Sequence, residues 1–130
     1  MTDQDTEQIY RKLREALAGR PEVAFAYLHG SFLQGLPYHD LDVALYLRPE
    51  AEDPFDYEMQ RSVEWTLLLD LPVDVRVLND APLGFQHTVL RGRPIFVRDE
   101  ALLTAFIEQV GRAYAEFAYL GRAYLREVTS

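Results

Sequence analysis

Residues 23–47, VAFAYLHGSFLQGLPYHDLDVALYL, decide the fold of this chain. The stretch begins with an apolar run at 23–28 and ends with a second run at 40–47. Runs of this length, rich in aromatic and branched residues, are typical of β-strands. Gly30 and Ser31 interrupt the first run, and a polar turn at 36–39 precedes the second. We therefore expect two strands joined by a connection that contains glycine.

The second predicted strand carries two acidic side chains on one face. Successive strand residues point to opposite sides of a sheet, so Asp40 and Asp42 share a face. Four aliphatic residues share the other face: Leu41, Val43, Leu45 and Leu47. This pattern directs the aliphatic face into a core and leaves two carboxylates together near the strand end. Two like charges this close repel each other unless they are solvated or a divalent cation binds between them.

The third predicted strand, residues 73–78 (VDVRVL), repeats the pattern. Its three valines form one face, and Asp74 and Arg76 form the other. If this strand pairs with 40–47 in suitable register, three carboxylates meet at neighbouring positions. Hard oxygen ligands of this kind suit Mg²⁺ or Mn²⁺. The alternative is a set of exposed polar positions on half-buried strands, with Asp74 and Arg76 in a salt bridge.

The connection between the first two strands is predicted to bind phosphate. Gly30 and Ser31 end the first strand and open a single helical turn at 32–34, which Gly35 stops. A strand that leads through glycine into a helix N-terminus presents unpaired backbone N–H groups to an anion. Gly30 would let a phosphate approach the backbone, and the Ser31 hydroxyl adds a donor. An ordinary Gly-Ser turn is the alternative.

The flanking sequence alternates helical and extended patterns. Asp53 and Pro54 provide an N-cap and a first-turn proline for one of the helices. That helix has an apolar residue at every fourth position: Phe55, Met59, Val63 and Leu67. The predicted helices span residues 6–18, 54–70, 82–91 and 99–127, with a further extended segment at 94–97. This alternation predicts an α+β fold, a small mixed β-sheet flanked by helices, in a single domain over residues 1–130.

The last predicted helix, 99–127, is long for a domain of this size. At about 1.5 Å per residue it would extend ~40 Å, so it either breaks near Gly111 or Gly121 or overhangs the body. Its apolar stripe is nearly continuous: Leu103, Phe106, Ile107, Val110, Tyr114, Phe117, Gly121, Leu125 and Val128, with Tyr119 and Tyr124 beside it. In the simplest interpretation the stripe covers the sheet. Its distal half has more aromatic surface than a small sheet can bury, so we expect a homodimer or a partner protein there.

Composition excludes several classes of protein. Among 130 residues, 13 are basic and 21 acidic, a formal net charge of −8, which disfavours nucleic acids and anionic membranes as partners. The absence of cysteine excludes disulfides, thiolate zinc sites and thiol nucleophiles. The first residues, MTDQDTE, are acidic where a signal peptide is basic, and no apolar run approaches the ~18 to 20 residues that span a bilayer. We expect a cytoplasmic protein.

Two motifs taken together resemble those of a known superfamily. HGSFLQG at residues 29–35 and DLDV at 40–43 are similar to the signature of the DNA polymerase beta-like nucleotidyltransferases, and Asp74 stands where that superfamily carries a third carboxylate. A short chain with a terminal helix looks like the minimal nucleotidyltransferase (MNT) domains, many of which are antitoxins paired with a HEPN-domain toxin. The resemblance covers nearly the whole chain, including residues 81–82 and 90–94.

The resemblance implies a nucleotidyltransferase fold and metal-dependent transfer of a nucleoside monophosphate. Asp40, Asp42 and Asp74 would be the catalytic carboxylates and the ligands of two Mg²⁺ ions, with Mn²⁺ as an alternative. Asp74 would also help to activate the acceptor hydroxyl. Gly30 and Ser31 would hold the phosphates of the nucleoside triphosphate. In the antitoxin branch, ATP supplies AMP to a tyrosine of the HEPN toxin.

Other functions stay open at this stage. Leu33, Gln34 and His39 differ from the residues that many members carry, which favours a binding module that keeps the fold and neutralises a partner by contact. A transferase acting on a small molecule would need the same donor half of the site. Three histidines loosely resemble the ligands of HD-type phosphohydrolases: His29, His39 and His87. Those ligands lie on helices of an all-helical domain, whereas residue 39 precedes a strand.

Overall fold

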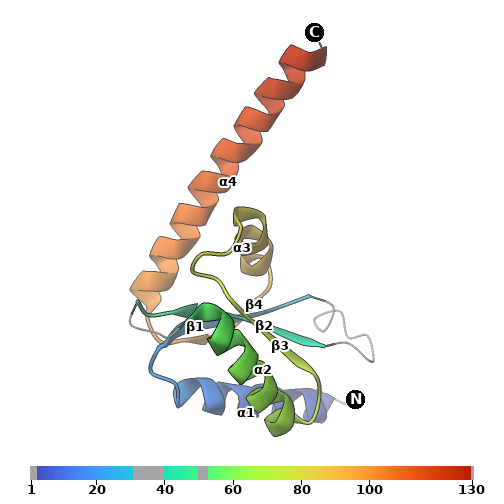
Figure 1. Ribbon diagram of the computed structural model, residues 1–130, viewed down its shortest axis with the longest axis vertical. Helices are drawn as coiled ribbons and strands as arrows, with labels where there is room; N and C mark the ends of the chain where they lie inside the picture. The colour runs from blue at the N-terminus through green and yellow to red at the C-terminus, as the bar shows by residue number, and fades with distance from the viewer. Residues whose placement is uncertain (1–2, 31–39, 50–52, 130) are drawn as a thin grey trace.

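The computed structural model describes residues 3–30, 40–49 and 53–129. Figure 1 shows the elements in this part of the chain: α1 (Asp3–Ala18), β1 (Val23–His29), β2 (Leu41–Leu47), α2 (Pro54–Leu69), β3 (Val73–Val77), α3 (Leu83–Leu90), β4 (Arg93–Val97) and α4 (Glu100–Thr129). Each agrees with a helix or strand expected from the sequence, with ends displaced by at most three residues. The helical turn predicted at 32–34 lies outside the described residues.

A four-stranded sheet in the order β3-β2-β1-β4 organises these elements. β1 pairs antiparallel with both β2 and β4, whereas β2 and β3 run parallel. A parallel pair needs a crossover connection, and α2 provides it. The sheet is therefore mixed and flanked by helices, as the sequence predicts.

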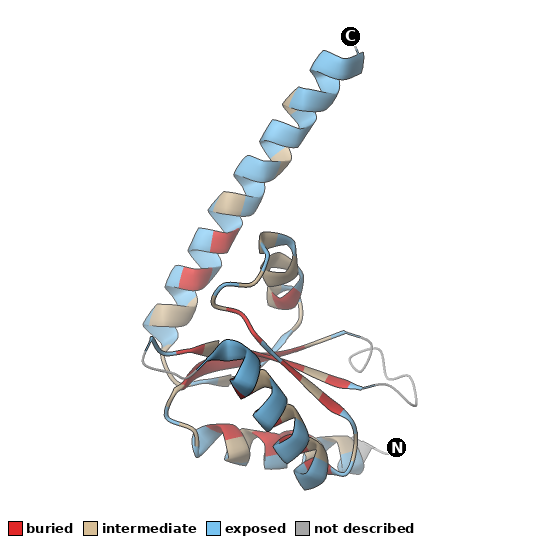
Figure 2. Cartoon of the chain, viewed as in Figure 1, coloured by how far each residue is buried: buried red, intermediate tan, exposed pale blue. Residues whose placement is uncertain are grey.

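Each face of the sheet has its own core. The aliphatic face of β2 and the valines of β3 pack against α1 and α2, around residues such as Leu13 and Trp65. The opposite face, which includes Phe25 and Ala44, packs against α3 and the first turns of α4. Figure 2 shows the buried residues gathered in the strands and on the helix sides that face them. The alternation of β2 and β3 thus places Asp42 and Asp74 on the α3 side.

α2 begins where the sequence indicates. The Asp53 Oδ1 accepts hydrogen bonds from the backbone N–H groups of Phe55, at 2.9 Å, and Asp56, at 3.2 Å. Pro54 lies in the first turn, where its missing N–H costs nothing. The helix ends at Asp70, which takes a left-handed backbone conformation with a φ of 55°.

The apolar stripe of α2 faces solvent. The buried residues of this helix are Tyr57, Arg61, Trp65 and Leu69. The stripe at every fourth position lies on another side of the helix, and its members are 54–78% exposed: Phe55, Met59, Val63 and Leu67. The helix is therefore apolar on two sides, and only one of them packs against the sheet.

Side chains of α2 satisfy the outer edge of β3. Three alternate backbone N–H groups of this edge strand donate to α2 side chains that are four residues apart. The pairs are Val73 to Thr66 Oγ1 at 2.9 Å, Val75 to Ser62 Oγ at 2.9 Å and Val77 to Glu58 Oε2 at 2.8 Å. Two strand residues and four helix residues both advance about 6 to 7 Å, so the spacings match. The match protects an edge that would otherwise expose unpaired donors.

α4 continues unbroken past Gly111 and Gly121 and overhangs the body, one of the two expected outcomes (Figure 1). Its 30 residues extend about 45 Å. Its buried residues, Phe106 and Val110, lie in the half that contacts the body. The distal aromatic residues are exposed, with Phe117 67% accessible. None of the described helices is both long and apolar enough to cross a membrane.

Candidate functional site

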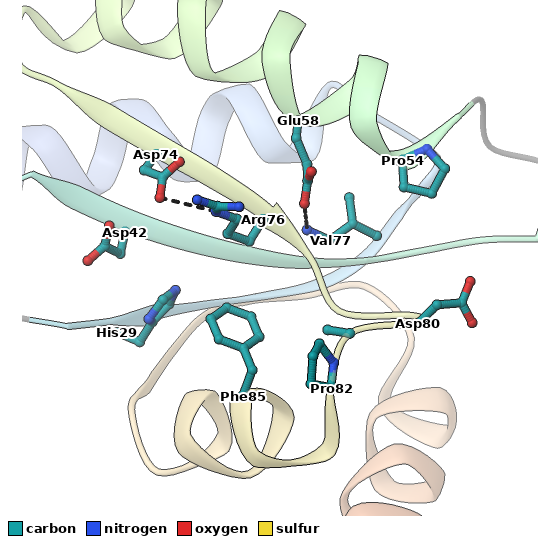
Figure 3. A pocket seen from close by; sticks show the side chains of 11 residues that line it. His29, Asp42, Pro54, Glu58, Asp74, Arg76, Val77, Asp80, Pro82 and Phe85 are labelled. Atoms are coloured by element: carbon teal, nitrogen blue, oxygen red, sulfur yellow. Dashed lines mark hydrogen bonds and ion pairs between the residues drawn. The ribbon is translucent and has the colours of Figure 1, made fainter.

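Three polar side chains form a row across three strands. His29 at the end of β1 is the register partner of Asp42 on β2, and Asp42 is in turn the partner of Asp74 on β3. Register partners lie on the same face of a sheet, so the three side chains point to the α3 side together. Figure 3 shows the row along one wall of a pocket. The parallel pairing thus brings together two of the three predicted carboxylates.

The Asp42 carboxylate occupies the space that a side chain at position 30 would fill. The backbone of Gly30 has a φ of 83°, a conformation that side chains rarely adopt. A Cβ at this position would also collide with the Asp42 Oδ2. Glycine is therefore required here for both the turn and the close approach of the carboxylate, whatever the function of the site.

The row forms part of a pocket of about 640 Å³. The pocket lies between the open end of the sheet, the first turns of α2 and the segment that leads into α3. It is lined by His29, Asp42, Pro54, Glu58, Asp74, Arg76, Val77, Asp80, Ala81, Pro82 and Phe85. Polar groups of the strands face an apolar wall that includes Pro82 and Phe85. A cavity with convergent polar groups and an apolar wall is typical of a small-molecule site.

The electrostatics of the row are those of partly buried, crowded groups. Burial raises the pKa of Asp42, and the negative charges of Asp74 and Asp40 raise it further, while His29 and Arg76 oppose the change. Burial lowers the pKa of His29, against the opposite effect of the two neighbouring carboxylates. A divalent cation would relieve the repulsion between the carboxylates.

His29 is held by aromatic packing. Its Nε2 is buried and has no hydrogen-bond partner within the described part of the chain. Its ring meets the ring of Phe85 edge to face, at 5.4 Å between centroids. This histidine lines the pocket, whereas its sequence context indicated only a place in the glycine motif and a loose likeness to an HD-type ligand. The position of His29 directly before Gly30 was the sequence feature that could have indicated a role in the site. Only the register between β1 and β2 shows that His29 lies opposite Asp42.

Asp74 is paired with Arg76. The Arg76 Nε donates to the Asp74 Oδ2 at 3.3 Å, and both side chains are about half exposed. This is the salt bridge that the alternative interpretation of the strand pattern predicts. Asp40, the first residue of the predicted strand 40–47, lies directly before the observed β2 and is exposed. Ser31 lies outside the described residues.

The donor chemistry of the site fits a divalent cation. Asp42 and Asp74 offer carboxylate oxygens at adjacent register positions, and Asp40 is close enough to act on Asp42 electrostatically. Among the described residues, no three acidic or histidine side chains converge closely enough to hold an ion as they stand. Asp74 is engaged instead in the ion pair with Arg76. Carboxylate oxygens are the ligands that Mg²⁺ and Mn²⁺ prefer, so the residue types present fit such an ion.

The family of the chain follows from its sequence. Residues 11–101 match the model of the family described as polymerase beta, nucleotidyltransferase. The chain belongs to this nucleotidyltransferase family. The matched residues contain Gly30 and the three aspartates, whereas nearly all of α4 lies beyond them. No curated protein sequence gives a significant match.

Solved structures share the nucleotidyltransferase fold. A toxin–antitoxin complex with AMP-PNP contains a chain that superimposes with a TM-score of 0.74 at 19% identity, covering 93% of this chain and 98% of that chain. A tri-AMPylated HEPN toxin of Shewanella oneidensis in complex with its MNT antitoxin gives 0.67 at 19% identity, with 100% of both chains covered. The MntA–HepT toxin–antitoxin complex gives 0.67 at 17%, covering 99% and 100%. These likenesses extend over α4 as well as the sheet.

The histidines do not form a phosphohydrolase site in the described residues. His29 lines the pocket from a strand, whereas His87 stacks on Tyr114 of α4, at 3.6 Å between ring centroids and 4° between ring planes. His39 lies outside the described residues. This arrangement disfavours the HD-type interpretation, whose ligands come from helices of an all-helical domain.

Proposed function

We propose that residues 1–130 act as one nucleotidyltransferase domain, a cytoplasmic antitoxin that transfers AMP from ATP to a tyrosine of a HEPN toxin. The observation that carries the proposal is the adjacency of Asp42 and Asp74 across β2 and β3, beside the turn at Gly30. Carboxylates at the mouth of a nucleotide-sized pocket suit phosphoryl transfer, where catalysis consists mainly of positioning and charge stabilisation.

Each residue has a part in this reaction. Asp40, Asp42 and Asp74 would hold Mg²⁺, or Mn²⁺ in its place, and bound cations would neutralise the phosphates of the nucleotide. Gly30 and Ser31 would hold the phosphates beyond the α-phosphate. The acceptor oxygen forms a bond to the α-phosphorus, the bond from that phosphorus to the bridging oxygen breaks, and pyrophosphate leaves. Asp74 would accept the proton of the hydroxyl.

The structural neighbours support the choice of donor and partner. One was crystallised with AMP-PNP, and another holds a HEPN toxin that carries three AMP groups. A third is a variant of the toxin–antitoxin pair in which two aspartates separated by one residue are changed to glutamate. Asp40 and Asp42 have the same spacing in this chain. The exposed distal half of α4 would contact the toxin or, alternatively, a second copy of the chain.

A contact-only antitoxin is the second candidate. Asp74 is engaged by Arg76, and residues 33, 34 and 39 depart from the common pattern of the family. A protein that neutralises its toxin by binding alone would keep α4 and would not need the carboxylates. A transferase that modifies a small molecule would keep the carboxylates and would not need α4.

Transfer of labelled AMP distinguishes these candidates. The protein is incubated with Mg²⁺, ATP labelled at the α-phosphate and a HEPN toxin encoded beside it. We expect the label on a toxin tyrosine, its loss in Asp42→Asn, and full activity in Asp56→Asn, a charge-matched control on α2. Toxin neutralisation without label, retained in Asp42→Asn, would establish the contact-only antitoxin.

A further inference from the structure

Arg76 carries a permanent positive charge among the described residues that line the pocket. Among the described residues that line it, four are acidic: Asp42, Glu58, Asp74 and Asp80. No lysine and no second arginine lines this cavity in the part of the chain that the structure describes. A nucleoside triphosphate carries about four negative charges, so these acids oppose its entry unless cations offset them. Arg76 is the protein's own contribution to that offset.

The position of Arg76 is fixed by the sheet. It is the register partner of Ala44, two residues along β3 from Asp74, and therefore lies on the pocket face beside the row. The valines on either side of Arg76 are buried on the other face. The backbone of Arg76 is therefore held within the sheet, while its side chain is 57% exposed and accessible to a ligand in the pocket.

The guanidinium has unused donors. Its recorded hydrogen bond uses Nε, and the two Nη nitrogens have no recorded partner among the described residues. A planar guanidinium matches the oxygens of a phosphate with two parallel N–H donors. The ion pair with Asp74 is half exposed, and pairs of this kind contribute little to stability. Exchanging Asp74 for a phosphate therefore costs little.

We propose that Arg76 binds a phosphate of the donor nucleotide and that it breaks its ion pair with Asp74 when it does so. This assignment rests on the proposed function and adds a positioning group to it. A cation bound by Asp74 displaces Arg76, and the released guanidinium turns to the phosphates. Metal and nucleotide binding are therefore coupled through one side chain, so that each favours the other.

Two binding measurements with opposite expected signs test the assignment. For Arg76→Gln, Mn²⁺ alone should bind about threefold more tightly, because Asp74 has lost its competing cation. AMP-PNP with saturating Mn²⁺ should bind at least about tenfold more weakly, because charged hydrogen bonds to phosphate are lost. Adenosine, which has no phosphate, should bind equally to variant and wild type. Titration calorimetry and Mn²⁺ paramagnetic resonance provide these affinities without turnover.

Matched variants separate a phosphate contact from a structural effect. Arg11→Gln on α1 makes the same change of charge on the far face of the sheet and should leave all three affinities unchanged. Arg76→Lys keeps the charge without the planar fork and should bind AMP-PNP with intermediate affinity. Equal weakening of AMP-PNP and adenosine in Arg76→Gln, or unchanged AMP-PNP affinity, overturns the assignment.

Failure of the assignment is distinguishable from failure of the proposed function. A wild-type protein that binds AMP-PNP but transfers no AMP rejects the transferase and leaves the Arg76 contact standing. Normal AMP transfer with unchanged nucleotide affinity in Arg76→Gln rejects the contact alone. A wild-type protein that does not bind AMP-PNP in the presence of Mn²⁺ rejects both.

Discussion

Gly30, directly after β1, lies so close to Asp42 on β2 that a side chain at position 30 would overlap the Asp42 carboxylate. The contact links the turn after β1 to the acid at the start of β2. Gly30→Ala should therefore lower the free energy of unfolding by about 1–3 kcal/mol, from the positive φ and the displaced carboxylate together. It should also weaken AMP-PNP binding.

Urea denaturation and calorimetry measure these two effects. Gly111→Ala is the matched control, because a Cβ at that position in α4 would meet no atom of the described residues within 4 Å beyond the adjacent residues and backbone of its own helix. A helical alanine there should leave stability unchanged or raise it by up to about 1 kcal/mol. Equal stability of Gly30→Ala and wild type would show that the turn accommodates a side chain.

The edge of β3 provides a second prediction. Ser62→Ala and Thr66→Val each remove the acceptor of a β3 backbone N–H. Each should cost about 1–2 kcal/mol, because the donor stays part-buried while its partner is gone. Thr104→Val, at an exposed position on α4, should change stability by less than about 0.5 kcal/mol. Unchanged urea midpoints for the two α2 variants would mean that water replaces the lost acceptors.

The strand faces were predictable because aliphatic residues occupy every second position of β2 and β3. Alternation assigned Leu41 and Val43 to a core and Asp42 to the opposite face, and the structure has them there. The protection of β3 was not predictable, because it depends on the angle at which α2 crosses the edge strand. The four-residue spacing of Ser62 and Thr66 predicts hydrogen bonds to β3 only when that angle is known.

The stripe of α2 shows the limit of periodicity. Val63 and its apolar neighbours at every fourth position have the spacing of a core face, yet the sheet packs against Tyr57 and Trp65 instead. Aromatic side chains bury more area than aliphatic ones, so the larger face is preferred. In the candidate site, Asp42 and Asp74 line the pocket from the strands in which the sequence placed them. His29 and Arg76 needed strand register, which a single sequence does not reveal.

Asp42→Asn should make the metal-free protein more stable at neutral pH. Burial raises the pKa of Asp42 in the folded state above its unfolded value, so the ionised carboxylate disfavours folding. This penalty is absent below the ordinary carboxylate pKa and develops as the pH rises through the raised one. Asparagine removes it, and we expect the melting temperature at pH 7 to rise by roughly 1–3 °C.

The pH dependence of this difference in melting temperature tests whether the ionised Asp42 carboxylate causes it. The advantage of Asp42→Asn should shrink as the pH falls toward the ordinary pKa of the carboxyl group, because wild-type Asp42 is then protonated as well. Mn²⁺ should stabilise the wild type and not the variant. A variant that melts below the wild type at pH 7 without metal would show that the Asp42 carboxylate has a structural partner.

Truncation after Arg112 should separate folding from partner binding. The shortened chain keeps Phe106 and Val110, the buried residues of α4, and loses the stacking of Tyr114 on His87. Its free energy of unfolding should fall by no more than about 1–1.5 kcal/mol. Binding to the HEPN toxin and any self-association should be lost with the exposed aromatic half.

Single substitutions in the full chain show whether the aromatic stripe itself makes the contact. Phe117→Ser and Tyr124→Ser remove exposed aromatic side chains and should each weaken toxin binding by about tenfold or more, since buried aromatic residues dominate interface energies. Arg122→Ser, also exposed on the distal half but outside the stripe, is the control and should bind nearly as the wild type does. Sedimentation and surface plasmon resonance measure self-association and toxin affinity separately, and they also identify which partner the helix binds. If the truncated chain keeps the toxin affinity and the oligomeric state of the full chain, the interface lies on the body. The exposed stripe of α2 is then the surface to mutate.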